Sequence, residues 1–96
     1  MNFEIATKST EIQANWDDAR LYCFAMDIDG KTGWRLPTKE ELNEIYQSEN
    51  DFVGNSYWSS TENFGSCAWV QSMGNGIRAN GSKKDGGFYV RAIRDL

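Results

Sequence analysis

Hydrophobic and polar residues alternate with a helical period between residues 15 and 26. The apolar positions recur every third or fourth residue and predict an amphipathic helix, with this buried stripe: Trp16, Ala19, Cys23 and Met26. Asn15 stands before the stripe and Asp18 lies three residues later, a spacing typical of a capped helix start. The segment "DIDGKTG" then ends the helix, with Gly30 and Gly33 free to adopt positive φ.

A second helix is predicted to begin at Thr38. Thr38 and Glu41 have the T-x-x-E spacing of a capping box, in which each residue bonds to the backbone N–H of the other. Leu42, Ile45 and Tyr46 follow at helical spacing and give this helix an apolar inner face.

The four residues before this helix, "WRLP", are predicted to form a short extended tether. Pro37 cannot continue a helix backwards, and it biases Leu36 toward extended backbone. Trp34 and Leu36 would then point into the core, whereas Arg35 would face the other way and bind a carboxylate or a carbonyl. We interpret this segment as a structural joint and place any binding site in the second half of the chain.

The composition changes at Gly54. Of the 34 residues from 54 to 87, seven are Gly, four Asn and six Ser, so half the segment is turn-forming or adaptable and polar. Strand-like runs interrupt it: "SYWSST", "CAWVQSM", "GIRAN" and, at its end, "GFYVRAIR", while "FEIA" near the start of the chain predicts one more strand. We expect "MGNGI" to form a hairpin turn and "NGS", at Asn80 to Ser82, to form another. Two helices followed by a meander of short strands predict an α+β domain with an antiparallel sheet.

Length and charge narrow the possible functions. Ninety-six residues suit a single domain spanning 1–96, and the net charge of −4 argues against a nucleic-acid partner. The charge is uneven: eleven acidic and five basic residues before Gly54 give −6, and three acidic and five basic ones after it give +2. No apolar run is long enough to cross a membrane, and the first residues lack the pattern of a secretory signal, so we expect no membrane insertion.

Two motifs that would indicate a bound ion fail on spacing. If Gly30 of "DIDG" took the sixth position of a calcium loop, Ala25 and Leu36 would take the first and twelfth, and neither can supply a side-chain ligand. In "GIRANGSKK" the Ser and Lys stand in the reverse of the order a phosphate loop needs. We therefore expect no metal and no cofactor.

Catalysis is poorly supported by the sequence. The chain has no histidine, so it has no Ser-His or Cys-His pair. Cys23 and Cys67 match no zinc or redox motif; they are expected to be buried thiols, with one disulfide as the alternative. Glu62 is the only acid between Asp51 and Asp85, and it either orients a hydroxylated ligand or pairs with Arg78. An enzyme would need Glu62 in a deep pocket, and we expect the protein not to be one.

"GWRLPTKEEL", "YWSSTE", "AWVQSMGNG" and "YVRAIR", in this order, resemble the bacterial domain named for the C-terminal part of the Legionella collagen-like protein. The resemblance covers residues 16–94 and implies a C-type-lectin-like fold, with two helices packed on a small twisted antiparallel sheet of short strands and neighbouring termini. It also implies a cell-surface, exported or phage-particle setting. The calcium-binding triplets of sugar-binding lectins and the cysteine pair of formylglycine-generating enzymes are missing here.

The resemblance assigns structural roles to several residues. It places an aromatic and aliphatic set in the core: Trp34, Leu36, Trp58, Trp69 and Val90. It marks Thr38 and Glu41 as a helix start, and it includes three arginines without a defined role, Arg35, Arg91 and Arg94.

On such a fold, binding surfaces are built from loops and late strands held by a rigid frame. Residues 54–87 have the Tyr, Ser, Gly, Asn and Trp content of adaptable binding loops. We therefore predict a non-enzymatic, calcium-independent recognition module for a protein or a glycan, with these contact residues: Glu62, Asn63, Phe64, Asn75, Arg78 and Asn80. The alternative is a structural or assembly subunit of a phage particle or surface appendage, which would show a large apolar interface and a defined oligomer.

Overall fold

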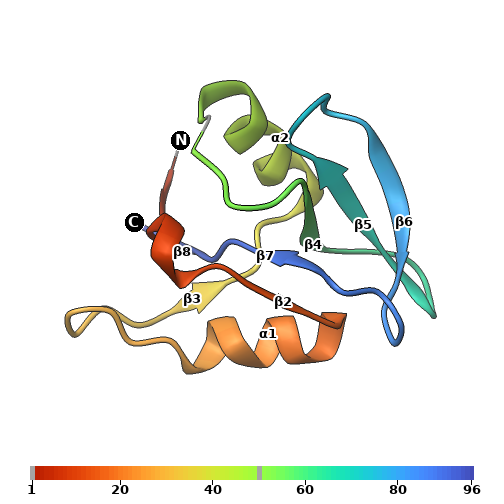
Figure 1. Cartoon of the computed structure of the whole chain (residues 1–96). Coiled ribbons are helices and arrows are strands. Elements are labelled where there is room, and N and C mark those ends of the chain that lie inside the picture. Colours follow the sequence, from red (N-terminus) through yellow and green to blue (C-terminus); the bar gives the residue numbers. More distant parts are fainter. Residues whose placement is uncertain (1, 50) are drawn as a thin grey trace.

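The computed structural model describes residues 2–49 and 51–96, and Figure 1 shows the order of the elements along the chain. Its helices are α1 (Trp16–Ala25) and α2 (Lys39–Ser48), with a short 3-10 turn at Lys8–Thr10. Its strands are β1 (Phe3–Ile5), β2 (Ile12–Ala14), β3 (Trp34–Arg35), β4 (Ser56–Phe64), β5 (Cys67–Ser72), β6 (Arg78–Ser82), β7 (Phe88–Val90) and β8 (Ile93–Asp95). The predicted α+β class is confirmed, and the arrangement is compatible with a C-type-lectin-like domain.

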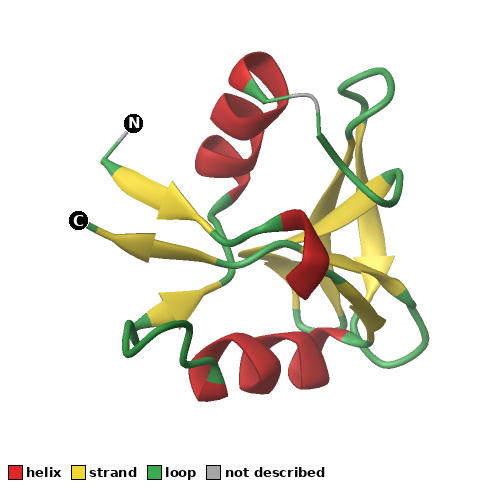
Figure 2. Ribbon diagram, turned by 60° about the vertical axis from the view of Figure 1, so that its left-hand side comes forward, coloured by secondary structure: helices red, strands yellow, loops and turns green. Residues whose placement is uncertain are grey.

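The strands form two sheets rather than one. The smaller has the order β1-β8-β3 and the larger β2-β7-β4-β5-β6, and every pairing is antiparallel except the parallel contact of β4 with β7. The two helices lie on opposite sides of the strands (Figures 1 and 2). Because β1 pairs with β8, with Phe3 opposite Asp95, the described ends of the chain lie side by side.

Both predicted helix starts are confirmed. The Asn15 side chain accepts a hydrogen bond from the backbone N–H of Asp18 at 2.9 Å. At α2, the Glu41 N–H donates to the Thr38 hydroxyl at 3.2 Å, and the Thr38 N–H donates to the Glu41 carboxylate at 2.8 Å, which completes the capping box. Gly30 and Gly33 have φ of 82° and 83°, as expected for the turn between the helices.

The core has two parts. The first packs α1 against strands of both sheets around Trp16, Trp34 and Trp58, and the second packs α2 against both sheets around Leu42, Ile45, Tyr57, Phe3 and Ile93. The buried indole N–H groups are satisfied: Trp58 donates to the Ala14 carbonyl at 2.8 Å and Trp16 to the Ser59 carbonyl at 2.9 Å. Four of the five expected core residues, Trp34, Leu36, Trp58 and Val90, are buried as predicted.

The fifth, Trp69, is not a core residue, and its assignment to the core is wrong. Its neighbours Ala68 and Val70 are buried in the first core, so Trp69 points to the opposite face of β5. There it is half-buried, with the Lys39 ammonium 4.8 Å from its ring centre. Residues 67–70 are all apolar, so the alternation of polar and apolar positions could not show which of them face the core.

The turn predicted at Asn80 to Ser82 is also wrong, because all three residues belong to β6 and the chain turns after them. Gly81 serves close packing instead. A Cβ at this position would lie 2.7 Å from the Trp58 ring and 2.8 Å from that of Phe88. The "MGNGI" turn is confirmed between β5 and β6, with Gly76 at a φ of 78°.

The run "GFYVRAIR" is not one strand but two, and Arg91 stands at the crossing between them. β7 belongs to the larger sheet and β8 to the smaller, so the chain passes from one to the other at residues 91 and 92. The Arg91 guanidinium is buried and donates to the Glu11 carboxylate at 2.6 Å and to the carbonyls of Ala6 and Asp51 at 2.7 and 2.9 Å. Tyr57 also donates to the buried Glu11 carboxylate. Arg91 therefore ties together three segments that are distant in sequence.

The other two arginines in question also have structural roles. Arg35 binds both oxygens of Glu41 at 2.7 and 2.8 Å and, through Nε and Nη2, the carboxylate of Asp95 at 3.2 and 2.8 Å. Arg35 thereby holds the pKa of Glu41 and that of Asp95 below their usual values. Arg94 binds Glu4 at 2.6 Å and the Thr32 carbonyl at 3.0 Å. The prediction that Arg35 faces away from the core to bind a carboxylate is confirmed.

Candidate functional site

The six predicted contact residues are all exposed and lie on or beside β4, β5 and β6, but they do not form one cluster. Glu62, Asn63 and Phe64 end β4, Asn75 lies in the turn between β5 and β6, and Arg78 and Asn80 lie on β6. The structure therefore places them at two ends and on two faces of the same part of the sheet.

Three of the six share one face with Trp69. Trp69 pairs with Asn80 and Gln71 with Arg78, so the side chains of Arg78 and Asn80 stand on the same side of the sheet as the Trp69 ring. The Asn63 side-chain amide donates to the Asn80 oxygen from β4. We call these four residues, Asn63, Trp69, Arg78 and Asn80, the outer face. Within residues 2–49 and 51–96, the Arg78 guanidinium has no ion-pair or hydrogen-bond partner.

Glu62 lies on the other side of the sheet and is paired. Its carboxylate accepts a hydrogen bond from the Lys83 ammonium at 3.0 Å, and that ammonium also lies 4.3 Å from the centre of the Trp16 ring. The predicted pair with Arg78 is therefore wrong. The reason is the strand pairing: Glu62 lies opposite Ala68, whose side chain faces the α1 core, whereas Arg78 lies opposite Gln71, on the other face of β5.

Of the two remaining residues, the Asn75 side chain is hydrogen-bonded within its own turn, whereas the Phe64 side chain is exposed. The Asn75 side-chain oxygen accepts a hydrogen bond from the Ile77 N–H at 3.0 Å, which stabilises the turn from within. Phe64 is 56% exposed at the end of β4, opposite Cys67, and touches neither core cluster. Of these two, only Phe64 presents an uncommitted surface.

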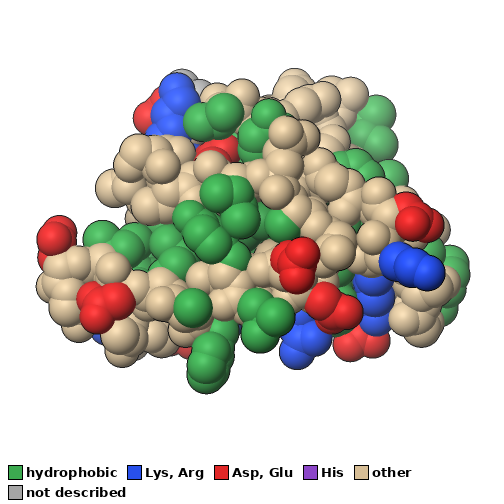
Figure 3. All heavy atoms as spheres, turned by 60° about the horizontal axis from the view of Figure 1, so that its bottom comes forward, with side chains coloured by type: hydrophobic (Ala, Val, Ile, Leu, Met, Phe, Trp, Pro, Cys, Tyr) green, Lys and Arg blue, Asp and Glu red, His purple; other side chains and the backbone are tan. Residues whose placement is uncertain are grey.

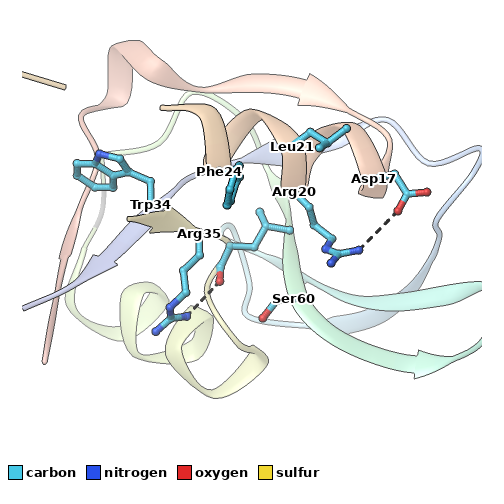
Figure 4. A pocket seen from close by; sticks show the side chains of 8 residues that line it. Asp17, Arg20, Leu21, Phe24, Trp34, Arg35 and Ser60 are labelled. Atoms are coloured by element: carbon cyan, nitrogen blue, oxygen red, sulfur yellow. Dashed lines mark hydrogen bonds and ion pairs between the residues drawn. The ribbon is translucent and has the colours of Figure 1, made fainter. Parts of the chain in front are cut away.

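A second surface, which the sequence analysis missed, is an open groove beside α1 with a volume of about 730 Å³ (Figure 4). Its walls are an outer stripe of α1 and the tether that precedes α2, and it is lined by Asp17, Arg20, Leu21, Phe24, Trp34, Arg35, Leu36 and Ser60. Leu21 is 65% exposed and Phe24 is 83% exposed, which is high for apolar side chains that share one helix face.

The sequence carried a signal for this groove. Leu21 and Phe24 are three residues apart and lie away from the buried stripe that begins at Trp16, so the helix has more apolar residues than its core face uses. Both the tether and the first helix line this groove, whereas the capped start of α2 does not.

Among the described residues, no three Cys, Asp or Glu side chains lie close enough to hold a metal ion. Neither α1 nor α2 is long and apolar enough to cross a membrane, in the part of the chain that the structure describes.

The two cysteines differ in access to solvent and are both free thiols here. Cys23 is fully buried in the first core, and burial raises the pKa of its thiol to about 12. Cys67 is half-exposed at the start of β5. The prediction of buried thiols is thus confirmed for Cys23 and wrong for Cys67.

This difference predicts the result of a thiol titration. With Ellman's reagent, the folded protein is expected to react at one thiol per chain, and a second thiol is expected to react only after unfolding, because the reactive species is an accessible thiolate. The Cys67→Ser variant should lose the fast reaction and the Cys23→Ser variant should keep it. Equal rates for both thiols in the folded protein would contradict this assignment of burial.

Comparison with known families gives a match over most of the chain. The family model described as the Lcl C-terminal domain matches residues 4–94, which is nearly the whole chain. No curated protein matches the sequence.

Proposed function

Because the chain belongs to the Lcl C-terminal domain family, we propose that it is a non-enzymatic recognition module that binds a protein or a glycan, without calcium, through its outer face. The observation that carries the proposal is the grouping of Trp69, Asn80, Asn63 and Arg78 on one sheet face, where Arg78 has no ion-pair partner among the described residues. The late strands supply this face, and the two helices and the core hold the strands in place.

The chemistry of the outer face suits a partner rich in hydroxyl or amide groups. The half-buried Trp69 ring offers an apolar surface for stacking, and the two asparagines and Arg78 offer directional donors and acceptors. Lys39 lies over the ring, and its long side chain can swing aside or contribute a further donor. Tyr, Trp and Arg are the residue types that contribute most to binding in protein interfaces.

The remaining polar groups support a binding role over a catalytic one. The most strongly buried carboxylate, Glu11, is saturated by Arg91 and Tyr57. The carboxylate once considered for catalysis, Glu62, pairs with Lys83 on the surface. With the Cys23 thiol buried and no histidine in the chain, these groups offer neither an activated nucleophile nor an accessible general base.

A direct test is binding of the purified protein to arrays of immobilised glycans and proteins, with and without EDTA. For a ligand of the outer face, Trp69→Ala and Arg78→Ala are expected to weaken binding at least tenfold, and EDTA is expected to have no effect. Lys8→Ala removes an exposed cation outside the outer face and is the control that should bind like the parent. The proposal is refuted if every ligand found is insensitive to both outer-face variants or requires calcium.

A second candidate, a structural or assembly subunit of a phage particle or surface appendage, is favoured by one observation, the exposed Leu21 and Phe24 beside the groove. It predicts a defined oligomer, whereas the recognition module predicts a monomer. Light scattering on the purified protein over a range of concentrations distinguishes the two.

A further inference from the structure

The groove beside α1 is independent of the outer face and has the features of an interaction surface. It is lined by Trp34 and Leu36 from the tether and by Leu21 and Phe24, which are carried by α1 (Figure 4). The inner side of α1 packs against the core through Trp16, Ala19 and Cys23, so the exposed Leu21 and Phe24 are not needed to hold the helix in place. The combination of a hollow and projecting apolar side chains fits a docked polypeptide segment better than a small molecule enclosed on all sides.

The charges around the groove indicate what kind of segment fits. Residues 16–29 contain four acidic side chains, Asp17, Asp18, Asp27 and Asp29, and one basic side chain, Arg20, which gives a net of −3. Asp17 and Asp18 lie at the N-terminal end of α1, and Asp27 and Asp29 follow its C-terminal end, where the helix carbonyls add further negative potential. Figure 3 shows hydrophobic side chains on the face that carries α1, acidic side chains toward both of its edges, and basic side chains beside the acidic ones at one edge.

The neighbouring cations do not neutralise this charge. Arg20 lies 3.7 Å from Asp17, and both side chains are more than half exposed, so their pair is weak. Arg35, the other cation of the groove, is fully engaged by Glu41 and Asp95. Within the described residues, Asp18, Asp27 and Asp29 take part in no ion pair. The groove thus has apolar side chains in its lining and lies between acidic side chains at the two ends of α1, of which Asp17 lines the groove itself.

We infer that this groove binds a segment of a partner protein that has two or three neighbouring apolar side chains flanked by lysine or arginine. The apolar side chains would lie between α1 and the tether, and the flanking cations would pair with Asp17 and Asp18 at one end and Asp27 and Asp29 at the other. A second copy of this chain is the weaker occupant, because both copies carry the same acidic ends and a net charge of −4.

The test uses synthetic peptides and the ¹⁵N-labelled full chain. The probe is a 14-residue peptide with Leu, Phe and Leu at helical spacing and two lysines at each end; one comparison peptide has glutamates for the lysines, and another has serines for the apolar residues. We expect the first peptide to shift the amide signals of residues 17–29, 34–36 and 60, and to bind at least tenfold more tightly than either comparison peptide. Raising the salt from 50 to 500 mM should weaken its binding several-fold.

Variants identify the surface. Leu21→Ser combined with Phe24→Ser is expected to weaken binding at least tenfold and to leave thermal unfolding unchanged, because both side chains are exposed. Val53→Ser removes an exposed apolar side chain elsewhere and is the matched control. The inference is overturned if the lysine peptide does not bind, if it binds no better than the glutamate peptide, or if the chain itself dimerises through Phe24. Because Trp69 and Arg78 are unchanged in these variants, ligands of the outer face should bind them normally, so failure here leaves the proposed function standing.

Discussion

Replacing Arg91 with methionine is expected to lower the free energy of unfolding by about 3–5 kcal/mol, because it leaves a buried carboxylate without its counter-charge. The Glu11 side chain is fully buried and that of Arg91 is 6% exposed, so water cannot reach either group to replace the lost interaction. The carbonyls of Ala6 and Asp51 lose their donor at the same time. Denaturant unfolding at low temperature measures the loss.

Arg94→Met is the matched control for this prediction. Arg94 stands three residues later, and its ion pair with Glu4 has the same 2.6 Å distance, but about 30% of each side chain is exposed. The expected loss is therefore about 0–1 kcal/mol. A domain of this length has a total stability of roughly 5–15 kcal/mol, so the two variants should be clearly separated. Equal losses would contradict the assigned role of burial.

The second large effect is expected for Trp58→Ala, at about 3–5 kcal/mol. Trp58 is fully buried, meets Phe88 edge to face with ring centres 5.0 Å apart, and has Gly81 against its ring. Truncation would leave a cavity in the core. The Ala14 carbonyl would also lose the hydrogen bond that it accepts from the Trp58 indole N–H. The measurement is again the denaturant midpoint.

Trp69→Ala is the matched control for Trp58→Ala. It makes the same substitution on the neighbouring strand, but on the outer face and not in the core. Trp69 is half-buried and lies outside both core clusters, so its loss of stability should be less than half that of Trp58→Ala. If the two variants were equally destabilised, Trp69 would be a core residue after all, and its use as a binding variant would be unsafe.

Sequence reasoning succeeded where the cause of a structure is local. The two helix starts depend on residues three positions apart, and the positive φ of Gly30 and Gly33 depends on the turn itself, so both could be derived from short segments. The interior positions of Trp34 and Leu36 follow in the same way from the extended geometry that Pro37 imposes.

It failed where the cause is a contact between distant segments. Nothing near Glu62 in the sequence indicates that strand pairing places it near Lys83 and places Arg78 on the other face. Likewise, nothing near Arg91 in the sequence indicates that β7 and β8 separate there or that Arg91 bonds to Glu11 and Ala6, eighty or more residues away. For the candidate site, the strands of the outer face could be predicted, but which side chains share that face depends on pairing that the sequence does not show.

The pairing of the two terminal strands has a mechanical consequence. Because β1 and β8 are antiparallel and begin and end at the same edge, a load applied through the two ends of the domain would act across the backbone hydrogen bonds one pair at a time, from Phe3 and Asp95 inward to Ile5 and Ile93. Such a seam peels open at low force, in contrast to strands loaded along their length, where all bonds resist together. Tension on a longer chain carrying this domain would therefore act first on this seam, which belongs to a different sheet from the strands of the outer face.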